Sequence, residues 1–155
     1  MRAALVLLLT LSAPAWAGEL AIVVDKTART LTVIDDGVAL RRFAGIRLGD
    51  APRGPKHFEG DERTPEGHYV ISGRNPESAY HLSLRISYPD DADRAYAAAH
   101  GRPPGGDIFV HGQPNDSAQD RIDEDWTDGC IALGNDEIEE LWDLVDDGTP
   151  IAILP

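Results

Sequence analysis

Cys130 is the single cysteine of the chain and lies at the end of the segment 126–130 (WTDGC). The preceding Gly129 permits a tight turn, and such a turn can aim backbone N–H groups at one point, as an oxyanion hole requires. His111 lies 19 residues upstream, before Gly112 and at the expected end of a strand. A thiol is only slightly ionised at neutral pH and becomes a good nucleophile beside an imidazole base. The pair predicts acyl transfer through a cysteine, although a free cysteine is also common as a small buried apolar residue.

The elements that must position this pair are mainly strands. Apolar positions alternate with polar ones in the early segments, and Asp36-Gly37 is a strong hairpin turn, so the chain is expected to begin as an antiparallel meander. The pattern predicts strands over residues 20–25, 30–35, 38–43, 68–72, 80–87, 107–110 and 149–154. Residues 73–76 (GRNP) are expected to join the fourth and fifth of these strands.

Helices and one long loop complete the expected fold, which is mainly β with two or three short helices. Residues 91–100 are Ala-rich with aspartates in the first turn, which favours a helix. Apolar residues at helical spacing from Ile138 to Val145 predict a second helix, with Asn135 as its N-cap. Residues 44–67 are rich in Gly, Pro and charge, and a loop of this length is usually functional. We expect it to gate or line the site.

Composition narrows the functional classes. The 155 residues fit one domain, and 14 Lys+Arg against 27 Asp+Glu give a net charge of −13. Such a surface repels phosphate backbones and anionic membranes, so nucleic acid is excluded as a partner. The spacings typical of zinc and calcium sites are absent, and no metal or other cofactor is expected.

Residues 1–17 have the pattern of a secretory signal peptide. Arg2 gives a positive start, residues 3–11 form a short apolar run, and Ala15-Trp16-Ala17 is an A-x-A cleavage pattern. The run is too short for a membrane span, which needs about 20 residues. The sequence therefore predicts cleavage after Ala17, a single domain over residues 18–155, and export to the periplasm or cell wall.

At these motifs the sequence resembles the L,D-transpeptidase catalytic domain family (YkuD-type). That family carries a His-Gly strand end followed, after a loop, by [Ser/Thr]-x-Gly-Cys, which stands here as His111-Gly112 and residues 127–130. Further matches extend the resemblance over essentially all of residues 18–155: Ile131, Leu133, Asn135, Gly60-Asp61, residues 64–69, residues 86–89 and residues 148–151. The resemblance implies a β-sandwich or open barrel.

The resemblance also implies a reaction. Cys130 would attack the carbonyl of the third residue of a peptidoglycan stem tetrapeptide, D-alanine would leave, and the acyl group would pass to an amine of another stem or of a protein. His111 would be the base and then the acid, the Gly129 and Cys130 amides would hold the oxyanion, and Thr127 would shape the turn. The expected substrate-binding residues are Gly112, Asp128, Trp126 and Tyr88; for Trp126 a core role is an equal alternative.

Two positions depart from the common family motif. Asp128 stands where the family usually has His, and Ala132 stands where it often has Arg. A carboxylate facing the sulfur should raise the thiol pKa, and the missing Arg removes one clamp for a carboxylate. Two other functions therefore remain open: an L,D-carboxypeptidase or hydrolase that uses water at the same site, and a non-catalytic module that binds the cell wall.

Overall fold

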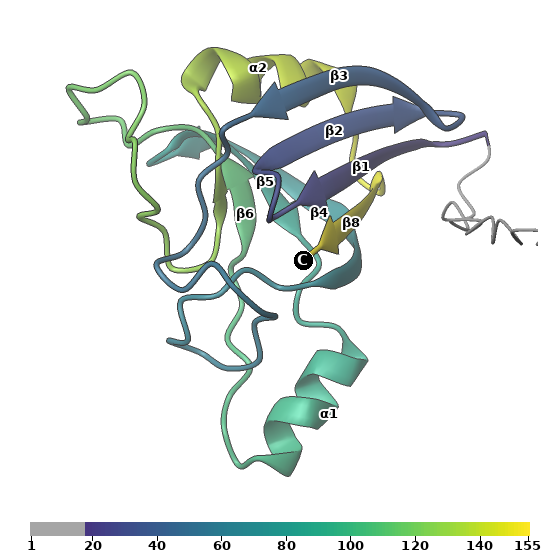
Figure 1. The fold of residues 1–155 in the computed structure, drawn as a ribbon, viewed down its shortest axis with the longest axis vertical. Coiled ribbons are helices and arrows are strands. Elements are labelled where there is room, and N and C mark those ends of the chain that lie inside the picture. Colours follow the sequence, from purple (N-terminus) through teal and green to yellow (C-terminus); the bar gives the residue numbers. More distant parts are fainter. Residues whose placement is uncertain (1–17) are drawn as a thin grey trace, which may run out of the picture.

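The computed structural model describes residues 18–155, so the expected signal peptide lies outside the described residues. Figure 1 shows the order of the elements along the chain. They are β1 (Leu20–Asp25), β2 (Thr30–Asp35), β3 (Val38–Ala44), β4 (Gly67–Ser78), β5 (His81–Ile86), α1 (Asp91–Ala99), β6 (Phe109–His111), β7 (Ile131–Ala132), α2 (Asn135–Leu144) and β8 (Pro150–Leu154). The predicted class, mainly β with two short helices, is confirmed.

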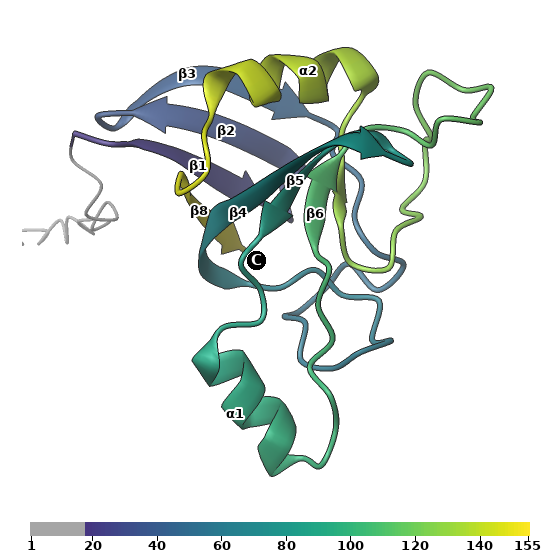
Figure 2. The same ribbon diagram turned by 180° about the vertical axis from the view of Figure 1, so that it is seen from behind.

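The strands form one mixed sheet in the order β3-β2-β1-β8-β4-β5-β6-β7. The antiparallel meander of β1, β2 and β3 is confirmed. The last strand, β8, lies between β1 and β4, parallel to the first and antiparallel to the second. Because β8 closes the gap between the meander and the β4–β5 hairpin, the chain end joins the two halves of the fold. Figure 2 shows β4, β5 and β6 side by side, with α2 above them.

The expected connection at residues 73–76 is wrong, because β4 continues through it to Ser78. The pairing of β4 with β5 shifts register between Ile71 and Gly73 and again between Asn75 and Ser78. Such irregularities are where a strand tolerates glycine and proline, so Gly73 and Pro76 mark bulges in the strand. The turn lies instead at residues 79–80, which carries Tyr80 to the site described below.

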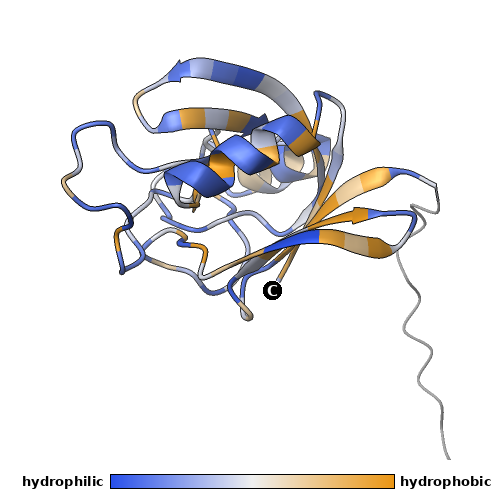
Figure 3. Ribbon diagram, turned by 90° about the horizontal axis from the view of Figure 1, so that it is seen from above, coloured by the Kyte–Doolittle hydropathy of each residue, from blue (hydrophilic) through white to orange (hydrophobic). Residues whose placement is uncertain are grey.

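Helix α2 begins at Asn135, but its N-cap is Gly134, so the expected N-cap is wrong by one residue. The Gly134 N–H donates to Glu137 Oε2 at 2.9 Å. The Asn135 side chain is used elsewhere, since its Oδ1 accepts the Gln113 N–H at 2.8 Å. The helix packs against β5 and buries Ile138 in the core. Figure 3 shows hydrophilic residues along α2 interspersed with the hydrophobic ones.

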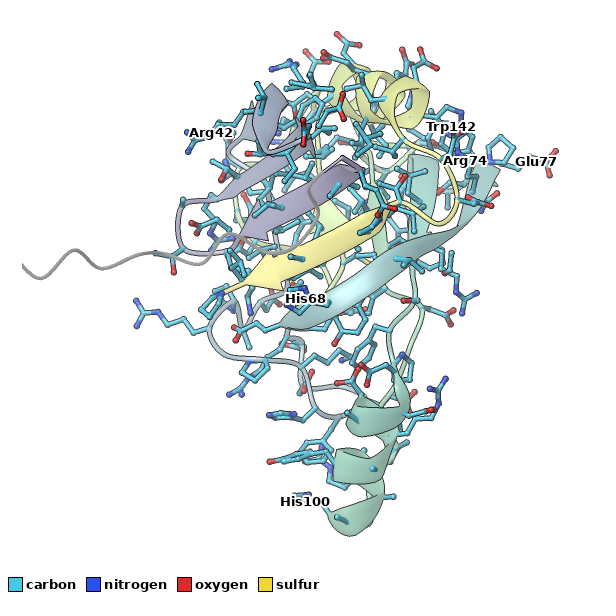
Figure 4. All side chains as sticks on the ribbon, turned by 90° about the vertical axis from the view of Figure 1, so that its right-hand side faces the viewer. Arg42, His68, Arg74, Glu77, His100 and Trp142 are labelled. Carbon is cyan, nitrogen blue, oxygen red and sulfur yellow. The ribbon has the colours of Figure 1, made fainter. Side chains whose placement is uncertain are left out.

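Arg74 of β4 closes the C-terminal end of α2, whose last turn has no basic residue. The Arg74 guanidinium lies 4.3 Å from the centre of the Trp142 ring. Figure 4 labels both residues at this end of the helix. It also donates to the carbonyl oxygens of Trp142 and Val145, the latter at 2.6 Å. A strand residue thus satisfies helix carbonyls that would otherwise lack partners.

Helix α1 lies away from the sheet, as both ribbon views show (Figures 1 and 2). Asp90 caps it, with its side chain accepting the Asp93 N–H at 2.8 Å. The Tyr69 hydroxyl donates to Asp93 Oδ2 at 3.1 Å, which ties the start of the helix to β4. In residues 18–155, neither helix has the length and apolar character that a membrane crossing requires.

Candidate active site

Cys130 and His111 line the same cavity, which has a volume of about 770 Å³. Part of the lining comes from the long loop, of which Lys56, Glu59 and Glu62 reach the cavity. The expectation that this loop lines the site is therefore confirmed. The other lining residues are Gly60, Asn75, Ser78, Ala79, Tyr80, Ser83, Gly105, Gly106, Asp107, Ile108, Phe109, Trp126, Thr127 and Asp128.

The parallel pairing of β6 with β7 aligns the cysteine with the histidine. His111 is paired with Ala132, and Cys130 lies two residues before Ala132. Paired residues share a face of a sheet, and so do residues two apart on one strand. Cys130 directly precedes β7, and its side chain and that of His111 line the same cavity.

The His111 ring is held in one orientation by its own chain neighbour. Its side chain is buried, and Nδ1 lies 2.7 Å from the carbonyl oxygen of Gly112. A carbonyl can only accept a hydrogen bond, so Nδ1 carries the proton and Nε2 is the proton acceptor of the ring. Burial lowers the pKa of His111 below its ordinary value, and the bond to Gly112 offsets this only in part. The ring is therefore a neutral base at neutral pH.

Two aromatic side chains fix the plane of this imidazole. Tyr80 stacks on His111 with ring centres 4.6 Å apart and planes at 29°. Trp126 lies against the same imidazole, with ring centres 5.5 Å apart. Tyr80 was missed at the sequence level because the β4–β5 turn was expected elsewhere. Trp126 lines the cavity and is only partly buried, so it is not one of the core residues; its expected part in substrate binding stays a prediction.

The Cys130 sulfur lies between two backbone groups of the segment that leads into β6. The Phe109 N–H donates to the sulfur at 3.4 Å, and the thiol donates to the Asp107 carbonyl oxygen at 3.5 Å. The first bond stabilises a thiolate and the second holds the protonated form. Neither residue was predicted for the site, although both lie in the predicted strand 107–110.

Cys130 is protonated in its resting state. Burial, together with the negative charges of Asp128 and Asp107, raises the pKa of its thiol to about 11. The Phe109 N–H and the positive charge of Lys56 act in the opposite direction. The sequence predicted that the carboxylate of Asp128 raises the pKa of the thiol, and the structure gives the same direction. A protonated thiol can attack a carbonyl carbon only if its proton leaves while the sulfur–carbon bond forms.

The turn before the cysteine is braced by Thr127. Its hydroxyl donates to the Cys130 carbonyl oxygen at 2.7 Å and accepts the Gly129 N–H at 3.2 Å. The Gly129 amide expected at the oxyanion thus has a partner inside the turn. Gly129 has a φ of +123°, and a Cβ there would lie 2.4 Å from the Arg63 carbonyl oxygen. Only glycine fits, because both the backbone conformation and the neighbouring loop exclude a side chain.

Gly112 lies behind the site and is not among the residues that line the cavity. Its N–H donates to the Tyr80 carbonyl oxygen at 3.0 Å, and its carbonyl holds His111. A Cβ at Gly112 would lie 2.6 Å from Asn135 Oδ1. The structure therefore places Gly112 as a support for the base, with Asn135 packed against it.

Tyr88, a further residue expected to bind substrate, does not reach the cavity. Its side chain is buried, its hydroxyl donates to the Pro104 carbonyl oxygen at 2.8 Å, and its ring meets Tyr69 edge to face. The structure thus separates Tyr88 from the other expected site residues. Asp128, by contrast, lines the cavity and is exposed to solvent.

Residues 18–155 contain no group of three or more His, Cys, Asp or Glu side chains placed to hold a metal ion. The histidines other than His111 lie outside the cavity lining. His81, for example, bonds Glu139 at 2.6 Å, and His100 is the C-cap of α1 (Figure 4).

Comparison with known proteins gives the family of the chain. Residues 19–153 match the family model described as YkuD, L,D-transpeptidase catalytic domain. The chain is 32% identical over 94 residues to the putative L,D-transpeptidase YafK of Escherichia coli, a match that covers 59% of this chain and 32% of that protein.

Solved structures show the same fold. The helical cell shape determining protein Pgp2 of Campylobacter jejuni superposes with a TM-score of 0.70 and 30% identity, covering 87% of this chain and 47% of Pgp2. Bd1075 of Bdellovibrio bacteriovorus gives 0.63 and 26%, covering 88% and 48%. L,D-transpeptidase 1 of Mycobacterium tuberculosis gives 0.56 and 20%, covering 88% and 62%, which is a likeness of fold. The chain spans less than two thirds of each of these proteins. It belongs to the L,D-transpeptidase catalytic domain family.

Proposed function

We propose that the chain is a cysteine L,D-transpeptidase that acts on stem tetrapeptides of peptidoglycan. The observation that carries the proposal is the His111 ring, whose Nδ1 is bonded to Gly112 while the imidazole and the Cys130 thiol line one cavity. The family match supports the reaction class. In this proposal Cys130 is the nucleophile and His111 the general base.

The proton has a defined route in this mechanism. His111 Nε2 takes the thiol proton as the sulfur attacks the carbonyl carbon of the third stem residue. The resulting imidazolium then protonates the amine of the leaving D-alanine, which yields the acyl-enzyme at Cys130. The acceptor amine gives its proton to Nε2 in the second half, and collapse restores the thiol. A neutral His111 at rest suits this role, because the base must first accept a proton.

The developing oxyanion needs N–H donors close to the sulfur. We assign the Cys130 amide to this role, and the Gly129 amide joins it once its 3.2 Å bond to Thr127 opens. A bond of that length is at the weak end of the usual range, so opening it costs little. The Thr127 bond to the Cys130 carbonyl keeps the turn in place meanwhile.

Mass spectrometry of disaccharide-tetrapeptide muropeptides tests the proposal, with wild type compared with Cys130→Ala. A cross-linked dimer that requires Cys130 and has lost D-alanine supports transpeptidation. A tripeptide product alone, also dependent on Cys130, would replace it with an L,D-carboxypeptidase that uses water. Identical products in both samples would reject the enzymatic proposal and favour the wall-binding module.

We further propose that the protein works outside the cytoplasmic membrane, in the periplasm or cell wall, where peptidoglycan lies. The pattern of residues 1–17 supports export. The likeness to a helical cell shape determining protein supports a role in cell shape. Cell fractionation tests the first proposal, and recovery of the protein in the cytoplasm would overturn it.

A further inference from the structure

Two lysines of this chain are almost fully buried, and they differ in how their ammonium groups are satisfied. Lys26 and Lys56 are each 4% exposed. Lys26 Nζ has three oxygen partners: the Gly54 carbonyl at 2.7 Å, the Thr64 carbonyl at 3.1 Å and Glu66 Oε1 at 2.9 Å. An ammonium has three N–H donors, so Lys26 is fully used within the protein.

Lys56 has two partners in the described structure. Its Nζ donates to the Phe58 carbonyl oxygen at 3.0 Å and to Asp61 Oδ1 at 2.8 Å. One donor of the ammonium therefore has no protein acceptor among residues 18–155. Lys56 also lines the cavity of Cys130, which Lys26 does not. A buried charge with a remaining donor costs free energy unless a partner takes that donor.

The Asp61 carboxylate that pairs with Lys56 is itself held by the backbone of the loop. The Asp61 carboxylate also accepts the backbone N–H groups of His57 at 2.7 Å, Phe58 at 2.9 Å and Arg63 at 3.2 Å. Burial would raise the pKa of Asp61, but these bonds and the one from Lys56 together lower it. Because several donors hold Asp61, the loop fixes the position of Lys56 and leaves the third N–H of its ammonium for a ligand.

The other charged residues of the cavity make Lys56 the place where a substrate carboxylate is attracted. Lys56 is the one Lys or Arg among the described lining residues, while Glu59, Glu62, Asp107 and Asp128 line the same space. These carboxylates repel a substrate carboxylate over most of the cavity, and Lys56 is where one is attracted. The influence of Lys56 on the Cys130 thiol places the ammonium within electrostatic reach of the sulfur.

We propose that the third donor of Lys56 binds a carboxylate of the substrate and so sets the position of the peptide relative to Cys130. The inference deepens the proposed function, since its ligand is the donor stem peptide. Two carboxylates have the right chemistry. One is the terminal carboxylate of D-alanine, one residue or about 3.8 Å beyond the scissile carbonyl. The other is a side-chain carboxylate of the third residue when that residue is diaminopimelate.

Binding to the Cys130→Ala protein tests this without turnover. Calorimetry compares three tetrapeptides: one with diaminopimelate and a free C-terminus, its C-terminal carboxamide, and one with lysine in place of diaminopimelate. Loss of a charge-assisted hydrogen bond should weaken binding of the carboxamide or of the lysine peptide about 10- to 100-fold. Adding Lys56→Met should remove that difference, and the peptide whose penalty disappears identifies the carboxylate.

Lys26→Met is the matched control, since it removes an equally buried ammonium outside the cavity; it should keep the full discrimination. Ratios of Kd are compared because they do not depend on the fraction of folded protein. Lys56→Gln, which keeps a donor for the Phe58 carbonyl, serves where Lys56→Met does not fold. Equal Kd values for all three peptides, or discrimination that survives loss of Lys56, would overturn the inference. Failure of the proposed function would give a different result: the wild-type protein would bind the peptides but would not turn them over.

Discussion

His111 Nδ1 lies 2.7 Å from the carbonyl oxygen of Gly112, so the imidazole that we propose as the general base is oriented by the residue that follows it. No carboxylate is needed for this purpose, and the backbone fixes the tautomer. The bond depends on Gly112 staying in place, which its N–H bond to the Tyr80 carbonyl and its contact with Asn135 ensure. His111 is thus the last residue of β6, and its ring is held by the backbone that follows it.

Replacing His111 by Gln should lower turnover at least about 100-fold, because proton transfer by a positioned base contributes that much or more. Steady-state release of D-alanine measures the effect, and circular dichroism checks that the variant is folded. His100→Gln, on the exposed end of α1, is the control and should leave turnover unchanged. Near-normal turnover in folded His111→Gln would exclude His111 as the base.

The buried imidazole also predicts a dependence of stability on pH. The folded-state pKa of His111 lies below its ordinary value of about 6.5, so the unfolded chain binds a proton more readily. The stability linked to His111 is therefore present above about pH 6.5 and is lost as the pH falls through the folded-state pKa. Urea unfolding between pH 7 and pH 5 should show a smaller loss in His111→Gln than in wild type. An equal loss of unfolding free energy in both proteins would contradict the lowered pKa of His111.

The thiol should react slowly at neutral pH and faster as the pH rises. With a pKa of about 11, roughly 10⁻⁴ of Cys130 is thiolate at pH 7. The rate of alkylation by iodoacetamide should therefore rise about tenfold per pH unit up to pH 10, as intact mass spectrometry can follow.

Asp128→Asn tests the electrostatic part of this shift. Removing the carboxylate lowers the pKa of Cys130, so alkylation at a fixed pH should be about twofold to tenfold faster. Asp147→Asn removes an exposed charge beyond the end of α2 and is the matched control. A rate unchanged by Asp128→Asn, or raised equally by both variants, would contradict the role given to Asp128.

Much of the site was predictable because its signals are local. A histidine at a strand end and a cysteine after Gly129 both depend on short segments, and the strand pairing of β6 with β7 brings them together. Tyr80 and Lys56 were not predicted, because their positions depend on contacts between distant parts of the chain. Tyr80 reaches His111 only because β4 runs past its expected end.

In the fold, too, the features set by local sequence were predictable and those set by distant contacts were not. The meander, the two helices and the closing strand follow from alternation, turn residues and helical spacing. The continuation of β4 through Gly73 and Pro76 does not, because pairing with β5 outweighs the local preference of those residues for turns. The N-cap of α2 was misplaced because the Asn135 side chain accepts the N–H of Gln113, a residue distant in the sequence, and does not cap its own helix.

Alanine at two glycines should separate a required glycine from a tolerated one. Gly129→Ala places a Cβ 2.4 Å from the Arg63 carbonyl oxygen at a φ of +123°, whereas a Cβ at Gly73 meets nothing within 4 Å. We expect Gly129→Ala to lose about 2 kcal/mol or more of unfolding free energy, and Gly73→Ala to stay within about 0.5 kcal/mol of wild type. Urea unfolding measures both, and equal losses would contradict the assignment of Gly129 to a strained turn.

Arg29 and Asp125 form the ion pair that should matter most for placing the segment that carries the cysteine. Two bonds of 2.6 Å join the guanidinium to the carboxylate, and Asp125 Oδ1 also accepts the Leu48 N–H at 2.9 Å. The next residue, Trp126, donates its N–H to the Leu48 carbonyl at 3.2 Å and packs on His111. A bidentate, partly buried pair of this kind should show a coupling free energy of about 1–3 kcal/mol.

A double-mutant cycle with Arg29→Met and Asp125→Asn, read out by urea unfolding, measures that coupling. The pair Arg41–Glu140 is the control, because its side chains are 41% and 45% exposed and its coupling should be much smaller. Burial would raise the pKa of Asp125, but the bonds from Arg29 and Leu48 lower it overall. The coupling should therefore be full above about pH 4 and be lost as the pH falls through the folded-state pKa. A coupling no larger than that of the control would mean that other contacts hold the segment before Trp126.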